Sequence, residues 1–319
     1  MGSLCAARRR GAVQRCNICF GRWAVVASAT GAMFGAAYGM LSQQGQRVRR
    51  DIVIPGWSPF RADGVYLPDG TGPHAPSDPD SAILASAVGH SPVLRLAMLG
   101  DSLAAGLGVD QPEQLPGVVL ARGLADNSGR PVQLDTLAIC GCTSRLLAGQ
   151  VDAALLTAPH AALVVIGSND VTRRIPPWES ARLLGEAVSR LRAAGTTVIA
   201  GTCPDLGTIR QIPQPSRAIA HTFSWALARL QHDAICAAGG LPVSLAQLLA
   251  RDFRTQPDIL FGRDHFHPST AGYDTACSML LPTLCSALRD GGIGGWAATR
   301  FGNMTAAAGS PDTTRPGSP

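Results

Sequence analysis

The chain contains no lysine, few aromatic residues and little charge of either sign. All 27 basic residues among its 319 positions are arginine, aromatic residues make up 5% and charged residues 15%. Residues 51–319 hold 19 of these arginines against 22 acidic residues, so their net charge is about −3. A nucleic-acid-binding face needs basic side chains interleaved with aromatic ones across a folded surface. The composition therefore argues against nucleic acid as a partner.

The first fifty residues lack acidic side chains altogether and hold eight arginines, which account for the net charge of +5. Within them, residues 23–41 form 19 consecutive positions without a charge, preceded by five arginines and followed by three. An apolar segment of that length crosses a bilayer core as one helix. The arginine bias predicts that residues 1–22 lie in the cytoplasm and that the chain from residue 42 onward lies outside it. We therefore expect a transmembrane anchor at residues 23–41.

The same segment also fits the apolar core of a cleaved signal peptide. Small residues at 35–37 and 37–39 have the spacing that signal peptidase accepts. Both interpretations put the remaining chain outside the cytoplasm, either attached to the cell membrane or released into the cell envelope or medium. The choice between anchor and signal stays open.

Six of the nine cysteines lie beyond residue 139, in the part of the chain that is expected to be exported. Such a location permits disulfides without requiring them, and the spacing does not determine a pairing. Cys277 and Cys285 would lie about two turns apart on one helix, too far for a bridge between them. Cys16 and Cys19 have no second pair and no histidine nearby, so no zinc site is expected there.

Patterning divides the rest of the chain into three parts. Residues 42–93 are rich in proline, glycine, aspartate and serine, which predicts a linker or an irregular arm. Residues 290–319 have no apolar pattern, which predicts a disordered tail. Between them, residues 94–289 alternate short apolar runs with longer helical patterns, which is typical of βαβ units on a parallel sheet. The expected strands cover 94–99, 132–138, 161–166, 196–200 and 242–245, and the expected helices cover 115–127, 144–156, 178–194, 216–238 and 269–288.

The first expected strand ends in the tetrapeptide Gly100-Asp101-Ser102-Leu103. Gly100 permits a tight turn, and open α/β sheets bind their ligands at the carboxyl ends of parallel strands. Ser102 is therefore a candidate nucleophile. A serine at a strand-to-helix junction is also a routine helix N-cap, so the tetrapeptide alone leaves both interpretations open.

Two further strand ends on the same edge carry suitable hydrogen-bond donors. The second expected strand is followed by residues 140–144, which include Gly141, and the third by residues 167–170, which include Asn169. Acyl transfer needs N–H donors aimed at the carbonyl oxygen that becomes negative, and a glycine amide or an asparagine side chain supplies them. Each residue also fits an ordinary role in a turn or a cap.

An aspartate and two histidines stand just before the last expected helix, in residues 264–268. A carboxylate three residues before an imidazole, at a turn entering a helix, can reach its Nδ1 and orient its Nε2 toward a serine. That spacing, and the proline that follows, favour His267 over His265 as the partner of Asp264. The same side chains together with Asp101 would also suit a metal, but the serine and its donors account for them without one. We therefore expect no metal and no cofactor.

These four blocks, in this order, resemble those of the SGNH or GDSL hydrolase family. The resemblance covers residues 94–288 and implies a three-layer α/β/α sandwich, similar to flavodoxin, with about five parallel strands. Residues 201–207 further resemble actinobacterial, mycobacterial-type exported GDSL-like esterases. The Gly-x-Ser-x-Gly elbow of the α/β-hydrolase fold is absent, because Ala104 takes the place of its second glycine.

The resemblance also implies a role for each block. Ser102 would be the nucleophile, Asp264 and His267 would activate it, and the Ser102 amide, the Gly141 amide and the Asn169 side chain would form the oxyanion hole. The expected activity is that of an exported serine esterase that cleaves small, lipid or acylated-glycan esters through an acyl-serine intermediate. Two other functions stay open: a carbohydrate O-acyl esterase or acyltransferase acting on cell-envelope glycans, and a catalytically silent binding domain anchored in the membrane.

Overall fold

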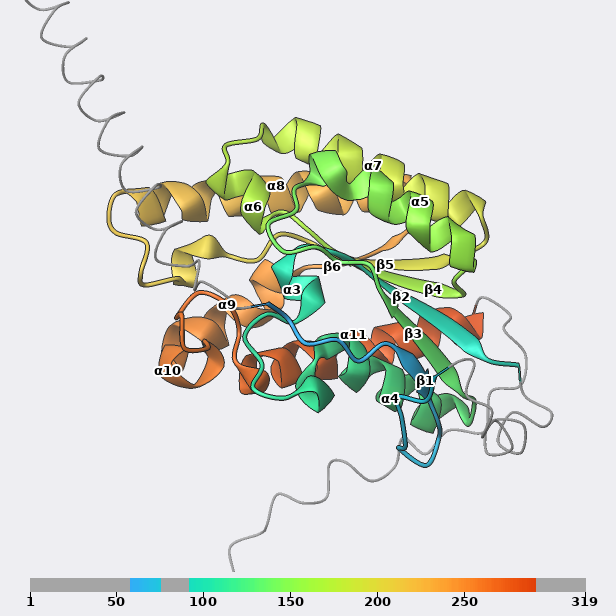
Figure 1. Ribbon diagram of the computed structural model, residues 1–319. Coiled ribbons are helices and arrows are strands. Elements are labelled where there is room, and N and C mark those ends of the chain that lie inside the picture. The colour runs from blue at the N-terminus through green and yellow to red at the C-terminus, as the bar shows by residue number, and fades with distance from the viewer. Residues whose placement is uncertain (1–57, 76–91, 291–319) are drawn as a thin grey trace, which may run out of the picture.

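A sheet of six strands runs through the centre of the molecule (Figure 1). The computed structural model describes residues 58–75 and 92–290. In spatial order the strands are β1-β3-β2-β4-β5-β6. Their bounds are β1 (Gly64–Tyr66), β2 (Leu94–Gly100), β3 (Val132–Thr136), β4 (Ala161–Val165), β5 (Thr197–Gly201) and β6 (Leu241–Val243).

Strands β2 to β6 pair in parallel, as the sequence predicts. Every residue of β4 and β5 is buried, and such continuous apolar runs are typical of parallel strands covered on both faces. Alternation along β2 sends Leu96 and Met98 to one apolar cluster and Ala97 and Leu99 to the other. The sheet therefore separates two cores.

Helices cover both faces of the sheet, which confirms the three-layer α/β/α sandwich. In Figure 1, α5, α7 and α8 lie on one side, and α4, α9, α10 and α11 lie on the other. The bounds are α3 (Ser102–Ala105), α4 (Pro116–Ser128), α5 (Leu147–Thr157), α6 (Ser168–Thr172), α7 (Pro177–Ala193), α8 (Ser216–Ala237), α9 (Leu245–Thr255), α10 (Pro257–Leu260) and α11 (Thr270–Asp290). Each of the five expected strands and five expected helices is present, with ends displaced by a few residues.

The sequence did not predict the strand β1, the helix α9 or the short helices α3, α6 and α10. β1 lies within the stretch that was expected to be irregular, and it pairs antiparallel with β3 at the edge of the sheet. Three residues are too short to show a periodicity, but Tyr66 is fully buried and its hydroxyl donates to the Ala62 carbonyl at 2.5 Å. Helix α9 was also missed, although Leu245, Leu249 and Phe253 recur at the four-residue spacing of one helix face.

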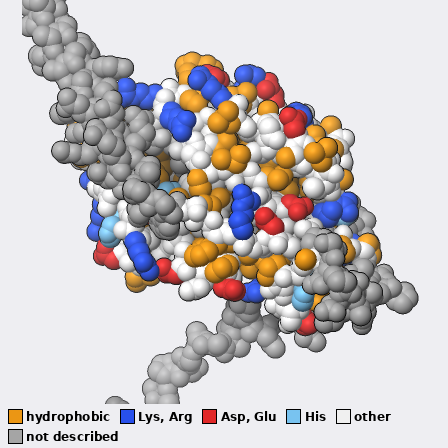
Figure 2. All heavy atoms as spheres, in the orientation of Figure 1, with side chains coloured by type: hydrophobic (Ala, Val, Ile, Leu, Met, Phe, Trp, Pro, Cys, Tyr) orange, Lys and Arg blue, Asp and Glu red, His pale blue; other side chains and the backbone are white. Residues whose placement is uncertain are grey.

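The six described cysteines are free thiols, and Cys277 and Cys285 lie on α11 without a bridge, as expected. On the face that Figure 2 shows, arginine side chains of the described residues are scattered among acidic and apolar ones and form no single basic surface there. Within the described residues, none of the helices is long and apolar enough to span a bilayer. The segments expected as cytoplasmic N-terminus (1–22) and as anchor or signal (23–41) lie outside the described residues. So does the expected tail (290–319), apart from Asp290, which ends α11.

Candidate active site

The turn that follows β2 presents Ser102 at the carboxyl edge of the sheet. Gly100 has φ of 133°, and a Cβ atom there would lie 1.8 Å from the Val165 carbonyl oxygen, so only glycine allows this approach of β2 to β4. Asp101 is the N-cap of α3, because its side chain accepts the Leu103 amide at 3.0 Å. The interpretation of Ser102 as the N-cap is therefore wrong, and its hydroxyl is used elsewhere.

Ser102, His267 and Asp264 are hydrogen-bonded in series. The Ser102 Oγ lies 2.9 Å from His267 Nε2, and His267 Nδ1 lies 2.5 Å from Asp264 Oδ2. Their exposed fractions are 8%, 3% and 6%. A series of this kind can pass the serine proton to the imidazole while the carboxylate fixes the ring orientation.

The turn between α10 and α11 makes this pairing local. The second oxygen of Asp264 accepts the backbone amides of Phe266 and His267, each at 3.0 Å, so the carboxylate is held at both ends. His265 adopts a left-handed φ of 50° and is exposed, whereas the ring that reaches Ser102 is that of His267. The structure thus places His267, and not His265, against Asp264 and Ser102.

Two buried aspartates near Ser102 have pKa values that are shifted in opposite directions. Burial acts to raise the pKa of Asp264, but the hydrogen bonds and charge of His267 and the two amides outweigh it, so its pKa lies below the usual value. Burial raises the pKa of Asp101 to about 7, against the opposing effects of the Leu103 amide and His267. Asp264 is therefore ionised at neutral pH, whereas Asp101 is partly neutral.

The predicted oxyanion donors Ser102, Gly141 and Asn169 follow the carboxyl ends of the neighbouring strands β2, β3 and β4. Asn169, in α6, directs its Nδ2 to the carboxylate of Asp101 at 3.4 Å, immediately beside Ser102. Gly141 has a left-handed φ of 77°, and its carbonyl accepts from Arg173 Nη2 at 3.0 Å. Within the described part of the chain, neither the Gly141 amide nor the Ser102 amide is used in a hydrogen bond.

Two buried glutamines hold the strand ends, and sequence reasoning missed both. Gln150 of α5 accepts from the Gly100 amide at 2.7 Å and donates to the Gly100 carbonyl at 2.9 Å. Gln231 of α8 accepts from the Cys203 amide at 2.7 Å and donates to the Ile166 carbonyl at 3.0 Å. The only available signal was a polar residue on an otherwise apolar helix face.

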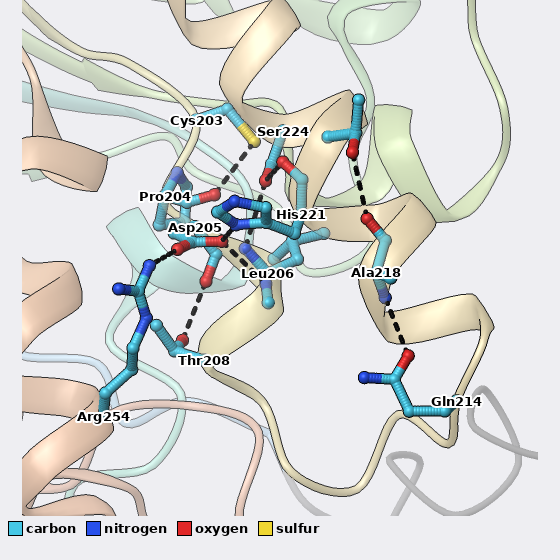
Figure 3. A network of polar contacts seen from close by, with 12 residues as sticks. Cys203, Pro204, Asp205, Leu206, Thr208, Gln214, Ala218, His221, Ser224 and Arg254 are labelled. Carbon is cyan, nitrogen blue, oxygen red and sulfur yellow. Dashed lines mark hydrogen bonds and ion pairs between the residues drawn. The ribbon is translucent and has the colours of Figure 1, made fainter.

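A second polar network holds the loop that follows β5 (Figure 3). Asp205 accepts the Gly207 amide at 2.8 Å, His221 Nδ1 at 2.7 Å and Arg254 Nη2. Burial acts to raise the pKa of Asp205, but the hydrogen bonds from His221, Arg254 and Gly207 bring it below the usual value. The network joins α8 and α9 through this loop.

A metal site is not assembled in the described residues, where no three histidine, cysteine, aspartate or glutamate side chains group as ligands. Three of the four side chains that were considered for a metal have other partners. Asp264 and His267 bond to each other, Asp101 caps α3, and His265 is exposed.

Comparison with known proteins identifies the family. Residues 98–275 match the model of the GDSL-like Lipase/Acylhydrolase family. A GDSL-like esterase of Mycobacterium tuberculosis is 41% identical over 271 residues, which cover 82% of this chain and 81% of that protein. Among solved structures, TesA has a TM-score of 0.51 at 22% identity, and a lipase/acylhydrolase from Enterococcus faecalis has 0.50 at 18%. Each covers 60% of this chain, with 99% and 96% of its own length matched, and these two likenesses concern the fold alone. The chain therefore belongs to the GDSL-like lipase/acylhydrolase family of hydrolases.

Proposed function

We propose that the protein is a serine esterase that hydrolyses carboxylic esters through an acyl-serine intermediate. The observation that carries this proposal is the hydrogen-bonded series of Ser102, His267 and Asp264 at the carboxyl edge of the sheet. A serine hydroxyl is a weak nucleophile unless a base within hydrogen-bond reach takes its proton. The 2.9 Å contact with His267 Nε2 meets that requirement. The complete series also argues against a catalytically silent binding domain.

In the acylation step, His267 Nε2 takes the Ser102 proton while Oγ attacks the ester carbonyl carbon. The carbonyl oxygen becomes negative and accepts hydrogen bonds from the Ser102 amide, the Gly141 amide and the Asn169 side chain. The tetrahedral intermediate then collapses, and His267 gives its proton to the leaving alcohol. The acyl group remains on Ser102.

Deacylation repeats these steps with water as the nucleophile. His267 removes a proton from water, the hydroxide attacks the acyl carbonyl, and the proton returns to Ser102 Oγ as the acid leaves. In both halves Asp264 keeps the Nδ1 proton on the imidazole and stabilises the positive charge that forms on it. The lowered pKa of Asp264 supports this role, because the carboxylate is ionised when the charge develops.

Substitution of the nucleophile tests the proposal directly. Ser102→Ala should reduce hydrolysis of p-nitrophenyl acetate and butyrate to below about 1% of wild type, because loss of a triad nucleophile costs several orders of magnitude. A fluorophosphonate probe should label wild type at Ser102 and leave the variant unlabelled. Ser278→Ala, a change of the same kind at an exposed position of α11, is the control and should retain both properties. Substantial activity in Ser102→Ala would refute the assignment.

We further propose that the hydrolase domain works outside the cytoplasm, with residues 23–41 as an anchor. The charge-free length of that segment and the arginine bias around it support this topology. Protease added to spheroplasts should digest the domain while a cytoplasmic marker survives. Amino-terminal sequencing of the mature protein distinguishes the alternatives, because a start between residues 36 and 40 indicates a cleaved signal. A full-length chain found in the cytosol would contradict both.

A further inference from the structure

The three proposed oxyanion donors follow three strands, of which two are not neighbours in the sheet. Ser102 follows β2, Gly141 follows β3 and Asn169 follows β4. Because β2 lies between β3 and β4, backbone pairing connects the Gly141 and Asn169 segments by way of β2. Both donors must nevertheless reach the same substrate oxygen. A direct contact between their segments therefore helps to set the spacing of the donors.

Asp170 makes such a contact. Its side chain is fully buried and belongs to α6, directly after Asn169. Both carboxylate oxygens accept the Ser144 backbone amide at 3.2 Å, and Oδ1 also accepts the Ser144 hydroxyl. Ser144 is buried and stands three positions after Gly141. One carboxylate thus joins the segment that carries Gly141 to the helix that carries Asn169.

The burial of this carboxylate is costly. Asp170 takes part in none of the ion pairs among the described residues. Burial raises the pKa of Asp170, although the hydrogen bonds from Ser144 oppose the rise. An apolar side chain would avoid that cost but would leave the Ser144 amide and hydroxyl buried without this acceptor. The contact with Ser144 is therefore what the carboxylate provides.

Arg173 holds the same segment from the exposed side. It follows the last residue of α6, and its Nη2 donates to the Gly141 carbonyl at 3.0 Å. A Cβ atom on Gly141 would lie 3.6 Å from the same Nη2, so the guanidinium packs directly against this glycine. Residues 141 and 144 are thus both bonded to side chains of α6 or of its C-terminal end.

We propose that Asp170 is a positioning residue, which together with Arg173 sets the distance between the Gly141 amide and the Asn169 side chain. The inference rests on the proposed esterase function. Both residues act through the two donors rather than on the substrate. A displacement of about 1 Å in a catalytic group can cost about a hundredfold in rate. Loss of the Asp170 contact should therefore lower kcat and leave KM nearly unchanged, because the oxyanion forms only in the chemical step.

Asp170→Asn tests the contact with almost no change in shape. One acceptor oxygen becomes an NH2 group, which meets the Ser144 amide as donor against donor. We expect kcat for p-nitrophenyl butyrate to fall about ten- to a hundredfold and KM to change by less than about twofold. Saturating fluorophosphonate labelling counts the competent sites, so kcat is expressed per labelled serine. An unchanged kcat per site, or a loss confined to KM, would overturn the inference.

A reversible transition-state analogue gives a measurement that partial unfolding does not alter. In n-butylboronic acid, boron bonds to Ser102 Oγ, the serine proton passes to His267, and a boron hydroxyl takes the place of the carbonyl oxygen. Its inhibition constant should rise in Asp170→Asn by the factor by which kcat/KM falls, since both depend on the same donors. Unfolding would lower the number of sites but not their affinity. An inhibition constant equal to that of wild type would contradict the proposed role.

The matched control is Glu179→Gln, an amidation that loosens the same segment elsewhere. Glu179 of α7 bonds to Arg145, the residue after Ser144, and both are partly exposed. This variant should keep kcat within about twofold. If Asp170→Asn does not fold, Ser144→Ala and the exposed Arg173→Met each remove one of the contacts. Each should lower kcat about three- to tenfold at constant KM.

A double variant tests whether Asp170 acts through Asn169. Asn169→Ala removes that donor and should lower kcat about a hundredfold. Once the donor is absent, its spacing from Gly141 no longer matters, so adding Asp170→Asn should cost at most about threefold more. Losses that multiply in full would mean that Asp170 acts independently of Asn169, against the inference.

The outcomes separate this inference from the proposed function. If Ser102→Ala is inactive but Asp170→Asn keeps the kcat of wild type, the esterase function stands and the positioning role is wrong. If Ser102→Ala hydrolyses these esters as well as wild type does, the proposed function itself is wrong.

Discussion

The molecule contains two aspartate–histidine pairs with similar contacts and different surroundings. Asp264 and His267 are 2.5 Å apart, three positions apart in sequence, and both side chains are buried. Asp205 and His221 are 2.7 Å apart, but the His221 side chain is 45% exposed and Asp205 also bonds to Arg254 (Figure 3). A hydrogen bond between carboxylate and imidazole is thus not enough to identify a catalytic pair.

The two pairs differ in the partners of the second imidazole nitrogen and of the carboxylate oxygens. His267 directs its second ring nitrogen at Ser102, and Asp264 accepts two backbone amides. Among the described residues, no arginine forms an ion pair with Asp264. Asp205 already accepts from the Arg254 guanidinium and the Gly207 amide as well as from His221. The Asp264–His267 pair therefore suits a general base. The Asp205–His221 pair, with Arg254, suits a structural contact that links α8 and α9.

Removal of each imidazole should give the largest contrast. His267→Ala deletes the base and should lower kcat for p-nitrophenyl butyrate by several orders of magnitude, as expected for a triad member. His221→Ala should change kcat by less than about threefold, since its ring does not face Ser102. His265→Ala serves as the local control and should behave like His221→Ala. A dead His265→Ala beside an active His267→Ala would show that the wrong histidine has been paired with Asp264.

Amidation of each carboxylate should give the next largest contrast. Asp264→Asn preserves shape but allows the imidazole to adopt the wrong tautomer, which costs up to about 10⁴ in turnover in measured triads. Asp205→Asn, in a network that does not touch the serine, should cost less than about tenfold. Steady-state kinetics on folded protein, with folding checked by circular dichroism, measures both. Equal losses in the two variants would remove the distinction between the pairs.

The sequence predicts the Asp264–His267 pair but not the Asp205–His221 pair, because only the first two residues are close along the chain. Asp264 and His267 are close along the chain, and Ser102 follows an apolar strand whose end is readable. Asp205 meets partners 16 and 49 positions away, and nothing near it in the chain signals them.

The same physical rule applies to the fold. The five parallel strands were predicted because each is an apolar run bounded by turns, whereas β1 has only three residues and pairs with a strand about seventy positions later. Gln150 and Gln231 clamp backbone groups 28 to 65 positions away. A sequence predicts patterns that are local in the chain. It does not predict contacts between distant residues, which form only when the layers pack together.

The smallest expected effect is on protein stability, when the Asp205–His221 pair is disrupted. Asp205→Asn should lower the free energy of unfolding by about 1–3 kcal/mol at neutral pH, because the new amide group meets Arg254 as donor against donor in a buried position. The Arg254 side chain is 51% exposed, so solvent weakens the lost ion pair and the lower part of that range is expected. Urea unfolding followed by fluorescence measures the difference, with His265→Ala as a variant that should leave stability unchanged within about 0.5 kcal/mol.

Acidification should remove the difference in free energy of unfolding between wild type and Asp205→Asn. The hydrogen bonds from His221, Arg254 and Gly207 outweigh burial and hold the pKa of Asp205 below its usual value. A carboxylate whose pKa is lowered by folding stabilises the protein above its unfolded pKa, about 3.9, and this contribution disappears as the pH falls through the folded pKa. Wild type should therefore exceed Asp205→Asn in stability by a constant amount between about pH 7 and pH 5, and by less below about pH 4. A gap that widened on acidification would mean that the network is stabilised by a protonated Asp205, and the account of this pair as an ionised fastening would then be wrong.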